Sequence, residues 1–199
     1  MATGVLLSEI FSKIESSGVA PRLLLHCCCA PCASHVIEYL SPSFVITALF
    51  YNPNIQPQEE YDKRAGEMRR LLDIAGYPNV EDLILCEHSG SAFDNISATF
   101  PNEPEGDLGC YACIDLRLRE AATRAKTGRY DFFATTLSVS PHKNALLINE
   151  IGVAGASNSG INYLVCDFKK QGGFQRSVEL SKRYGLYRQS YCGCLLRLT

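Results

Sequence analysis

Apolar runs and amphipathic stretches alternate along the whole chain. Five short runs are apolar enough to form buried strands, and they cover residues 22–28, 44–51, 83–86, 130–135 and 161–166. Apolar residues at helical spacing lie between and after these runs, which predicts helices near residues 31–40, 58–75, 91–99, 110–126, 141–151 and 173–184. An amphipathic helix that begins at Leu6 and ends near Gly18 precedes the first strand.

The order of these elements predicts the fold class. Strands that are apolar throughout and are separated by crossover helices are typical of a parallel sheet covered on both faces. We therefore predict an α/β fold, a single-domain three-layer α/β/α arrangement of residues 1–199 with a mostly parallel five-stranded sheet of Rossmann-like or HUP-like type. Ligands of such sheets bind beyond the carboxyl ends of the strands. Residues 100–109 are expected to form a mobile loop.

The composition limits the class of protein further. A length of 199 residues, of which 46% are hydrophobic, suits one globular domain. No apolar stretch is long enough to cross a membrane, and Glu9 and Glu15 interrupt the segment where a signal peptide would need an apolar core. We expect a cytoplasmic monomer without a membrane partner.

The ten cysteines are the unusual feature of the composition. A reducing cytosol keeps thiols from pairing, so metal binding or redox catalysis is the usual reason for so many. Seven of them fall into three closely spaced groups: Cys28, Cys29 and Cys32; Cys110 and Cys113; Cys192 and Cys194. One zinc ion or one [4Fe–4S] cluster needs four ligands, so the excess indicates a second metal centre or a redox-active dithiol. We expect the metal site at the carboxyl ends of the strands.

The remaining cysteines and a histidine favour a structural role. Cys86 and Cys166 each lie in an apolar run, which predicts buried side chains, and strand alternation directs Cys27 away from Cys28. His26 lies in the first strand and is interpreted as a core histidine rather than a ligand.

Five segments together resemble the QueH family of epoxyqueuosine reductases, from about residue 23 to residue 194. They are LLHCCCAPCASH, FYNPNI with the charged helix after it, CYACIDLRL, FFATTLSVSPHKN and CDFKKQGGFQRSVELSKRYGLYRQSYCGC. The resemblance implies a two-electron reduction of epoxyqueuosine to queuosine in the tRNA anticodon, without cobalamin, by a [4Fe–4S] cluster and an adjacent iron ion. The positions that match its metal ligands are Cys28, Cys29, Cys32, Cys110, Cys113, Cys192 and Cys194. Cys27 is a departure, since a non-cysteine residue is expected there.

Removal of an epoxide oxygen as water also needs proton donors. Tyr111, Tyr191 and His142 are the candidate acids. Asp167 follows the last strand and is either a hydrogen-bonding support for the cofactor or a capping carboxylate. Arg117 stands one helical turn after Cys113, where it either offsets negative charge at a cluster, contacts RNA or forms a surface ion pair.

Two segments are candidates for contact with tRNA. Residues 135–144 combine hydroxyls, amides and Lys143 at a predicted helix start, which suits a phosphate; the alternative is an ordinary helix cap with Pro141 in the first turn, and the family resemblance favours substrate or tRNA. From Lys169 to the last residue, seven basic residues accompany a single acidic one, Glu179, although the net charge of the chain is only −2. Aromatic residues lie between them, as in surfaces that bind unpaired bases, and a solvated helix face is the alternative. The candidate tRNA-binding residues are Lys143, Lys169, Lys170, Arg176 and Arg188.

Two other classes of protein remain open. A thiol–disulfide oxidoreductase would use Cys29 and Cys32, whose position at the start of a helix suits a redox pair. A zinc-stabilised RNA-binding module would use the cysteines for structure alone. The reductase would also need an electron donor, which the sequence does not identify.

Overall fold

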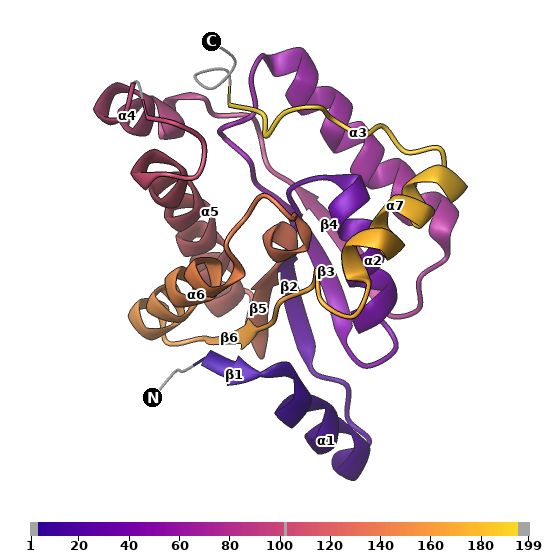
Figure 1. Cartoon of the computed structure of the whole chain (residues 1–199). Helices are drawn as coiled ribbons and strands as arrows, with labels where there is room; N and C mark the ends of the chain where they lie inside the picture. The colour runs from indigo at the N-terminus through magenta and orange to yellow at the C-terminus, as the bar shows by residue number, and fades with distance from the viewer. Residues whose placement is uncertain (1–3, 102, 195–199) are drawn as a thin grey trace.

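The computed structural model describes residues 4–101 and 103–194, so that Arg197, one of the seven basic residues counted above, lies outside it. The described chain forms one parallel sheet between two layers of helices (Figure 1). Its six strands are β1 (Gly4–Leu6), β2 (Arg22–His26), β3 (Val45–Phe50), β4 (Val80–Leu85), β5 (Phe132–Thr135) and β6 (Asn162–Val165). They stand in the order β1-β6-β5-β2-β3-β4, and every pairing is parallel.

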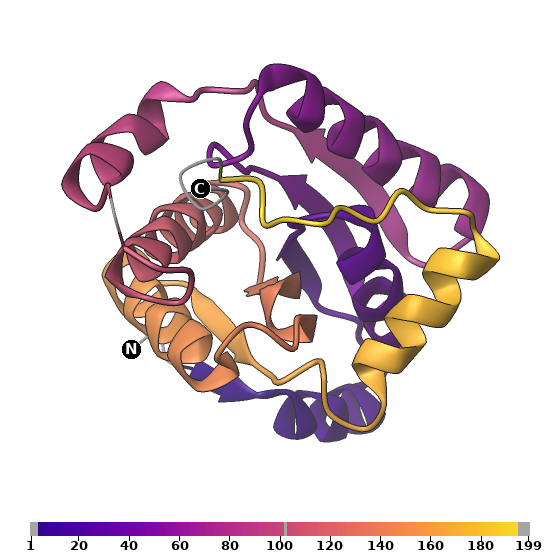
Figure 2. The same ribbon diagram turned by 45° about the horizontal axis from the view of Figure 1, so that its top comes forward.

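Helices cover both faces of this sheet. They are α1 (Leu7–Ser17), α2 (Ala30–Leu40), α3 (Gln58–Ala75), α4 (Ser91–Thr99), α5 (Leu108–Thr127), α6 (Ala145–Ser159) and α7 (Gly173–Arg183), with a 3-10 helix, η1 (Thr136–Val139). Helix α2 packs against α3 and α7 on one side, whereas α5 and α6 pack together on the other (Figure 2). The predicted three-layer α/β fold is therefore confirmed.

Alternation along β2 explains how one strand serves two cores. Leu23 and Leu25 are buried in the core that contains Ile37 of α2, whereas Leu24 belongs to the core that contains Leu118 of α5. Successive side chains of a strand point to opposite faces, so a strand that is covered on both sides must be apolar throughout. This is why the apolar run was a reliable sign of a central strand.

The predicted number of strands was wrong by one. Residues Gly4–Leu6 form β1, which pairs with β6 at the edge of the sheet, and Leu6 therefore ends a strand instead of beginning α1. A strand of three residues carries too few positions for a periodic pattern, so the sequence favoured an early start of the helix. The sheet is also entirely parallel among the described residues, rather than mostly parallel.

The start of α6 is a second correction. The sequence placed Pro141 in its first turn, but residues 136–139 form η1 and α6 begins only at Ala145. The reason is Asn144, whose side-chain Oδ1 accepts hydrogen bonds from the backbone N–H groups of Leu146 and Leu147. This is a strong N-cap, and it moves the helix start beyond the proline. Helix α5 in turn begins at Leu108, two residues before the predicted start.

The carboxyl ends of the strands are covered by loops that carry the polar motifs. β2 leads into the cysteines at the start of α2, and β3 leads into the segment that begins with Asn52. After α7, the chain crosses the same edge of the sheet towards the start of α5 (Figure 2). Within the described residues, no helix is both long and apolar enough to span a membrane.

Candidate metal centre

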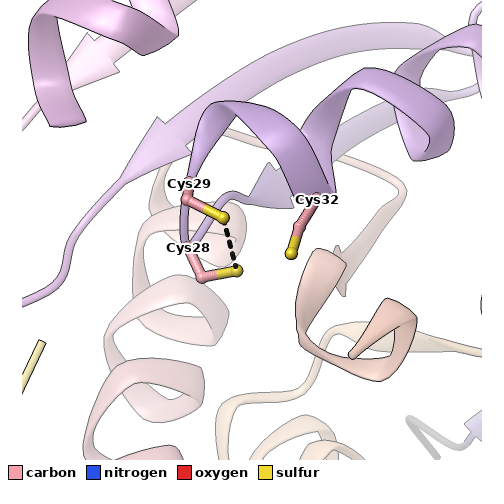
Figure 3. A group of neighbouring side chains, drawn as sticks. All are labelled: Cys28, Cys29 and Cys32. Atoms are coloured by element: carbon pink, nitrogen blue, oxygen red, sulfur yellow. Dashed lines mark hydrogen bonds between the residues drawn. The ribbon is translucent and has the colours of Figure 1, made fainter. Parts of the chain in front are cut away.

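Cys28, Cys29 and Cys32 form a compact thiol group at the end of β2. Their three Sγ atoms all lie within 4.8 Å of one another, and those of Cys28 and Cys29 are 3.8 Å apart (Figure 3). Thiolates that bind one tetrahedral ion at about 2.3 Å lie roughly 3.8 Å from each other. The group could therefore hold a metal ion with little rearrangement.

The pKa values of the three thiols are shifted in different directions. Cys29 and Cys32 donate towards the Cys28 sulfur and hold the pKa of Cys28 well below its usual range. The same interaction with Cys28 raises the pKa of Cys29 to about 12 and that of Cys32 well above its usual value. Thr136 supports this arrangement, because its Oγ1 lies 3.4 Å from Cys28 Sγ and accepts the Cys28 N–H at 3.2 Å. The group carries one favoured thiolate, the form that binds metal.

Four more cysteines surround a cavity of about 130 Å³. Cys110 and Cys113 come from the first turns of α5, while Cys192 and Cys194 come from the segment after α7. The backbone N–H of Gly106 donates to Cys110 Sγ at 3.3 Å. Burial raises the pKa of Cys113 to about 11, and nearby Arg117 opposes that rise. These cysteines supply the number of thiolate ligands that a four-iron cluster takes.

A larger cavity of about 410 Å³ adjoins the smaller one. Cys28, Cys32 and Cys192 line it, so it reaches both groups of cysteines. The residues that line both cavities are Glu105, Arg117, His142, Lys143 and Cys192. Six of the seven cysteines predicted as ligands therefore line two adjoining cavities at the carboxyl edge of the sheet, whereas Cys29 lies beside Cys28 and Cys32 but in the lining of neither cavity.

The segment that carries Cys192 and Cys194 is held by buried Arg64. Its guanidinium donates to the backbone oxygens of Tyr191 and Cys192, while Nε pairs with Glu60 at 2.7 Å. Gly193 accepts a backbone hydrogen bond from Gln56 at 2.8 Å.

Gly193 itself fits where no other residue would. Its φ is +116°, and an added Cβ would lie 2.8 Å from Ile55 Cγ1. Only glycine adopts this conformation readily and permits the close approach of the segment that carries Cys192 and Cys194.

Two cations point at the cysteines. Arg117 is only 2% exposed, and its Nε donates to the backbone oxygen of Cys113 at 3.2 Å. Lys143 Nζ lies 3.7 Å from Cys192 Sγ. Burial lowers the pKa of Lys143, but the Cys192 and Cys28 thiolates outweigh it and raise that pKa overall. The alternative prediction that Arg117 forms a surface ion pair is therefore wrong. The two cations would stabilise negative charge on the cysteines or on a group bound to them.

The three candidate acids and Asp167 have different surroundings. Tyr111 lines the smaller cavity, and exposed His142 lines both cavities. Tyr191 lines the larger cavity, but its hydroxyl donates to the backbone oxygen of Gln56 at 2.8 Å. Asp167 lies outside the lining of both and pairs with Lys169 at 3.2 Å. Their catalytic roles stay predictions, with His142 the best placed and Asp167 the worst.

The candidate tRNA-binding cations are mostly engaged within the protein. Lys143 points inward, with its Nζ near Cys192 Sγ. Lys169 Nζ donates a hydrogen bond to the backbone oxygen of Lys143 at 3.1 Å. Arg176 makes a bidentate pair with Glu38 and a further bond to Glu179. Two others are freer to reach a ligand: Arg188, which donates to Ser181 Oγ and lines the larger cavity, and exposed Lys170. RNA contact by these five residues stays a prediction.

The residues expected to be structural need one correction. Cys27 is buried as predicted, and so is His26, whose Nδ1 and Thr135 Oγ1 are 2.8 Å apart. Cys86 and Cys166 are only half-buried, because β4 and β6 each end one residue before the cysteine. The prediction that they lie buried inside strands was therefore wrong.

Residues 135–144 resemble a capped turn more than a phosphate cradle. Thr135 and Ser138 are buried, and Thr135 Oγ1 accepts a hydrogen bond from the N–H of Leu137. Asn144 caps α6, as described above. These groups are already satisfied inside the protein, which supports the helix-cap alternative, although the cap is Asn144 and Pro141 lies before the first turn.

Sequence reasoning missed several polar residues that line the two cavities, among them Asn52, Asn54, Arg64 and Glu105. Asn52 and Asn54 belong to the FYNPNI motif, where two amides directly after a central strand were the available signal. Both are 1% exposed, and each lines a cavity. Arg64 belongs to a charged helix, so nothing in its local pattern indicates that it is buried. Glu105 comes from the predicted loop and lines both cavities.

The fold and the site define a cysteine-rich α/β protein with a candidate metal centre at the carboxyl edge of a parallel sheet. The family model for epoxyqueuosine reductase QueH matches residues 23–198. This chain therefore belongs to the QueH family.

Three relatives illustrate how far the similarity extends, and each bears the name Epoxyqueuosine reductase QueH. The protein of Staphylococcus epidermidis is 37% identical over 193 residues, which cover 95% of this chain and 81% of the relative. The protein of Streptococcus pyogenes serotype M1 is 37% identical over 183 residues, which cover 91% of this chain and 72% of the relative. The protein of Thermotoga maritima is 33% identical over 176 residues, which cover 88% of this chain and 90% of the relative.

Proposed function

We propose that this chain reduces epoxyqueuosine to queuosine in the anticodon of tRNA, without cobalamin. The epoxide gains two electrons and two protons, both of its C–O bonds break, and the products are a carbon–carbon double bond and one water molecule. The observation that carries the proposal is the cavity of about 410 Å³ lined by Cys28, Cys32 and Cys192, in a chain of the QueH family.

The cofactor we propose is a [4Fe–4S] cluster with an adjacent iron ion. The residues that would hold them are Cys28, Cys29, Cys32, Cys110, Cys113, Cys192 and Cys194. When bound, this centre supplies the electrons and a Lewis acid for the departing oxygen. The donor set fits it, because a compact group of three thiols adjoins a group of four, and two cations face them.

The larger cavity suits the modified base. Pro31, Leu137, Phe174 and Tyr191 offer it apolar surface, whereas Arg188, Gln189 and Ser190 offer hydrogen bonds. A site of this kind binds one base that has been drawn out of its stack. Exposed Lys170 and Arg188 are the residues we propose for the flanking phosphates.

Protons must reach the departing oxygen from this cavity. His142 is our proposed donor, because it is exposed to solvent and lines both cavities. Tyr111 is the alternative from the smaller cavity. Tyr191 and Asp167 are less suitable, since the first donates to Gln56 and the second is paired with Lys169.

The dithiol alternative fits less well. A nucleophilic cysteine needs an accessible sulfur and a lowered pKa, but Cys29 is 1% exposed and its pKa is raised to about 12. The zinc-module alternative accounts for the compact group of three thiols, but a structural zinc site does not explain the cavity of about 410 Å³ beside it. The test of function must therefore separate iron from zinc.

The deciding experiment is anaerobic purification with iron and sulfide analysis, followed by a single turnover. tRNA that contains epoxyqueuosine is mixed with the protein and a chemical reductant, and the nucleoside is analysed by mass spectrometry. We expect four or five irons per chain and the loss of one oxygen atom. Cys28→Ala should abolish turnover, whereas Cys86→Ala should keep it. An iron-free protein that stays inactive after anaerobic reconstitution would contradict the proposal, and stoichiometric zinc would then favour the RNA-binding module.

A further inference from the structure

Arg117 is a buried cation that has no carboxylate partner among the residues that the structure describes. It lies on α5, one turn after Cys113, and its side chain is 2% exposed. Its Nε donates to the backbone oxygen of Cys113, and Nη1 lies 3.5 Å from Asn52 Oδ1. None of the ion pairs formed in residues 4–101 and 103–194 includes it. Two neutral oxygens are poor compensation for a guanidinium that has left water.

The anions that would compensate Arg117 are the sulfurs. Cys113 lies one helical turn before Arg117, and the cavities that the Arg117 side chain lines are also lined by Cys28, Cys110, Cys113 and Cys192. Arg117 also lines both cavities, so it lies where the two groups of cysteines meet. It is thus in place to act on whatever the cysteines bind.

Asn54 provides an independent observation. It is 1% exposed and lines the smaller cavity, and its Oδ1 has no hydrogen-bond partner among the described residues. A buried amide without a partner is costly, so it is expected to bind a group that enters the cavity. A half-turn of the side-chain amide exchanges its oxygen and nitrogen, which allows Nδ2 to donate to sulfur.

Contacts from Arg117 and Asn54 would change the reduction potential of an iron–sulfur centre, because such a centre is negatively charged. A four-iron core of charge +2 with four thiolates carries a net charge of −2, and each electron adds one negative charge. The potential of such a cluster depends on nearby charge and on hydrogen bonds to its sulfurs. A fixed cation and an amide donor stabilise the reduced form more than the oxidised form.

We propose that Arg117, assisted by Asn54, raises the reduction potential of the metal centre held by Cys110, Cys113, Cys192 and Cys194. Both act as positioning residues through the centre and not on the substrate. The inference rests on the proposed function, because it requires an iron–sulfur centre. It adds which side chains make that centre easier to reduce.

The test is a redox titration of anaerobically reconstituted protein, followed by optical and electron-paramagnetic-resonance spectra. We compare the unmodified chain with Arg117→Met, Arg117→Lys and Asn54→Leu. Arg119→Met is the matched control, since Arg119 lies on the same helix but is exposed and paired with Asp115. Iron and sulfide are measured in each sample, so that the potential is read only from loaded protein.

We expect Arg117→Met to lower the equilibrium constant for reduction about tenfold, which is 59 mV for a one-electron couple. Arg117→Lys keeps the charge and should stay within about threefold of the unmodified chain, while Asn54→Leu should lower the constant about threefold. Arg119→Met should change nothing. The spectra should keep their form, because the cysteine ligands are unaltered.

The outcomes separate this inference from the proposed function. An unmodified chain that assembles no iron–sulfur centre contradicts both. A loaded chain that reduces epoxyqueuosine, with unchanged potentials in Arg117→Met and Asn54→Leu, overturns the inference alone. If circular dichroism shows that Arg117→Met does not fold, Arg117→Gln and Asn54→Leu decide the matter, and unchanged potentials in these two overturn the inference.

Discussion

The side-chain amide of Asn52 donates a hydrogen bond to the backbone oxygen of Cys27 over 2.9 Å. This bond ties the segment after β3 to the turn after β2, directly before the compact thiol group. Both Asn52 and Cys27 are buried, so neither group can turn to water instead. The conformation of the cysteine turn therefore depends on a residue 25 positions away.

Asn52→Ala should lower the free energy of unfolding by about 2 kcal/mol, because it leaves a buried carbonyl without a donor. Chemical denaturation of the metal-free protein measures this change. Asn158→Ala is the control, since Asn158 is exposed on α6, and its change should stay within about 0.5 kcal/mol. Equal stabilities of the two variants would show that the Cys27 carbonyl finds another partner.

Arg64→Met should release the segment that carries Cys192 and Cys194. The guanidinium is 2% exposed and Glu60 only 11%, so the change leaves a nearly buried carboxylate without its cation. We expect a loss of about 3 kcal/mol in the free energy of unfolding. Limited proteolysis should also cut near residue 191 more rapidly. Arg69→Met, on the exposed face of the same helix, should do neither.

Each cysteine of the compact thiol group should be needed for metal binding. In an anaerobic cobalt titration of the metal-free protein, Cys28→Ala and Cys32→Ala should weaken the first bound ion at least about 100-fold. The intense absorption of thiolate-bound cobalt measures this loss. Cys86→Ala should bind as the unmodified chain does, because Cys86 follows β4 and is absent from both cavities. Equal loss in Cys86→Ala would assign the effect to folding rather than to ligation.

The pair between Glu38 and Arg176 should make stability depend on acid pH. Hydrogen bonds from Arg176 hold the pKa of Glu38 below its usual value of 4.5. The unfolded chain thus binds the proton more readily, and stability rises with pH through this range. The contribution is complete above about pH 4.5 and is lost as pH falls through the lower pKa of the folded state.

Glu38→Gln should remove this dependence and cost about 1 kcal/mol at neutral pH, since the pair is bidentate but partly exposed. Urea denaturation between pH 3 and pH 7 measures both effects. Glu81→Gln, a change at an exposed carboxylate, is the control. A profile for Glu38→Gln that still follows the unmodified chain would assign the acid sensitivity to other groups.

The sequence predicted the sheet better than its edge. β2 and β3 are buried on both faces, and their uninterrupted apolar runs follow from that burial. β1 has only three residues and depends on its pairing with β6, a contact between segments far apart in the sequence that no local pattern contains. The start of α6 was misplaced because Asn144 competes successfully with Pro141, and local propensity does not rank such caps.

The candidate site was predictable where its chemistry shows in the residue type. Cysteine spacing indicated seven ligand positions, and in the structure six of them line two adjoining cavities while Cys29 lies beside Cys28 and Cys32. The direction of long side chains was not predictable. Lys143 was interpreted as a partner for phosphate but points at Cys192, and Arg64 looked like one more charge on a surface helix but is buried. Both outcomes depend on tertiary packing.

The smaller cavity draws its cysteines from two distant parts of the chain, residues 110–113 and 192–194. A centre bound there would act as a covalent staple across a loop of about 80 residues, comparable to a disulfide worth about 4 kcal/mol. Because metal that binds only the folded chain shifts the folding equilibrium, the metal-bound protein would be more stable than the metal-free protein and would be degraded more slowly. If that centre is the iron–sulfur cluster proposed above, the amount of this protein in a cell would follow the supply of iron.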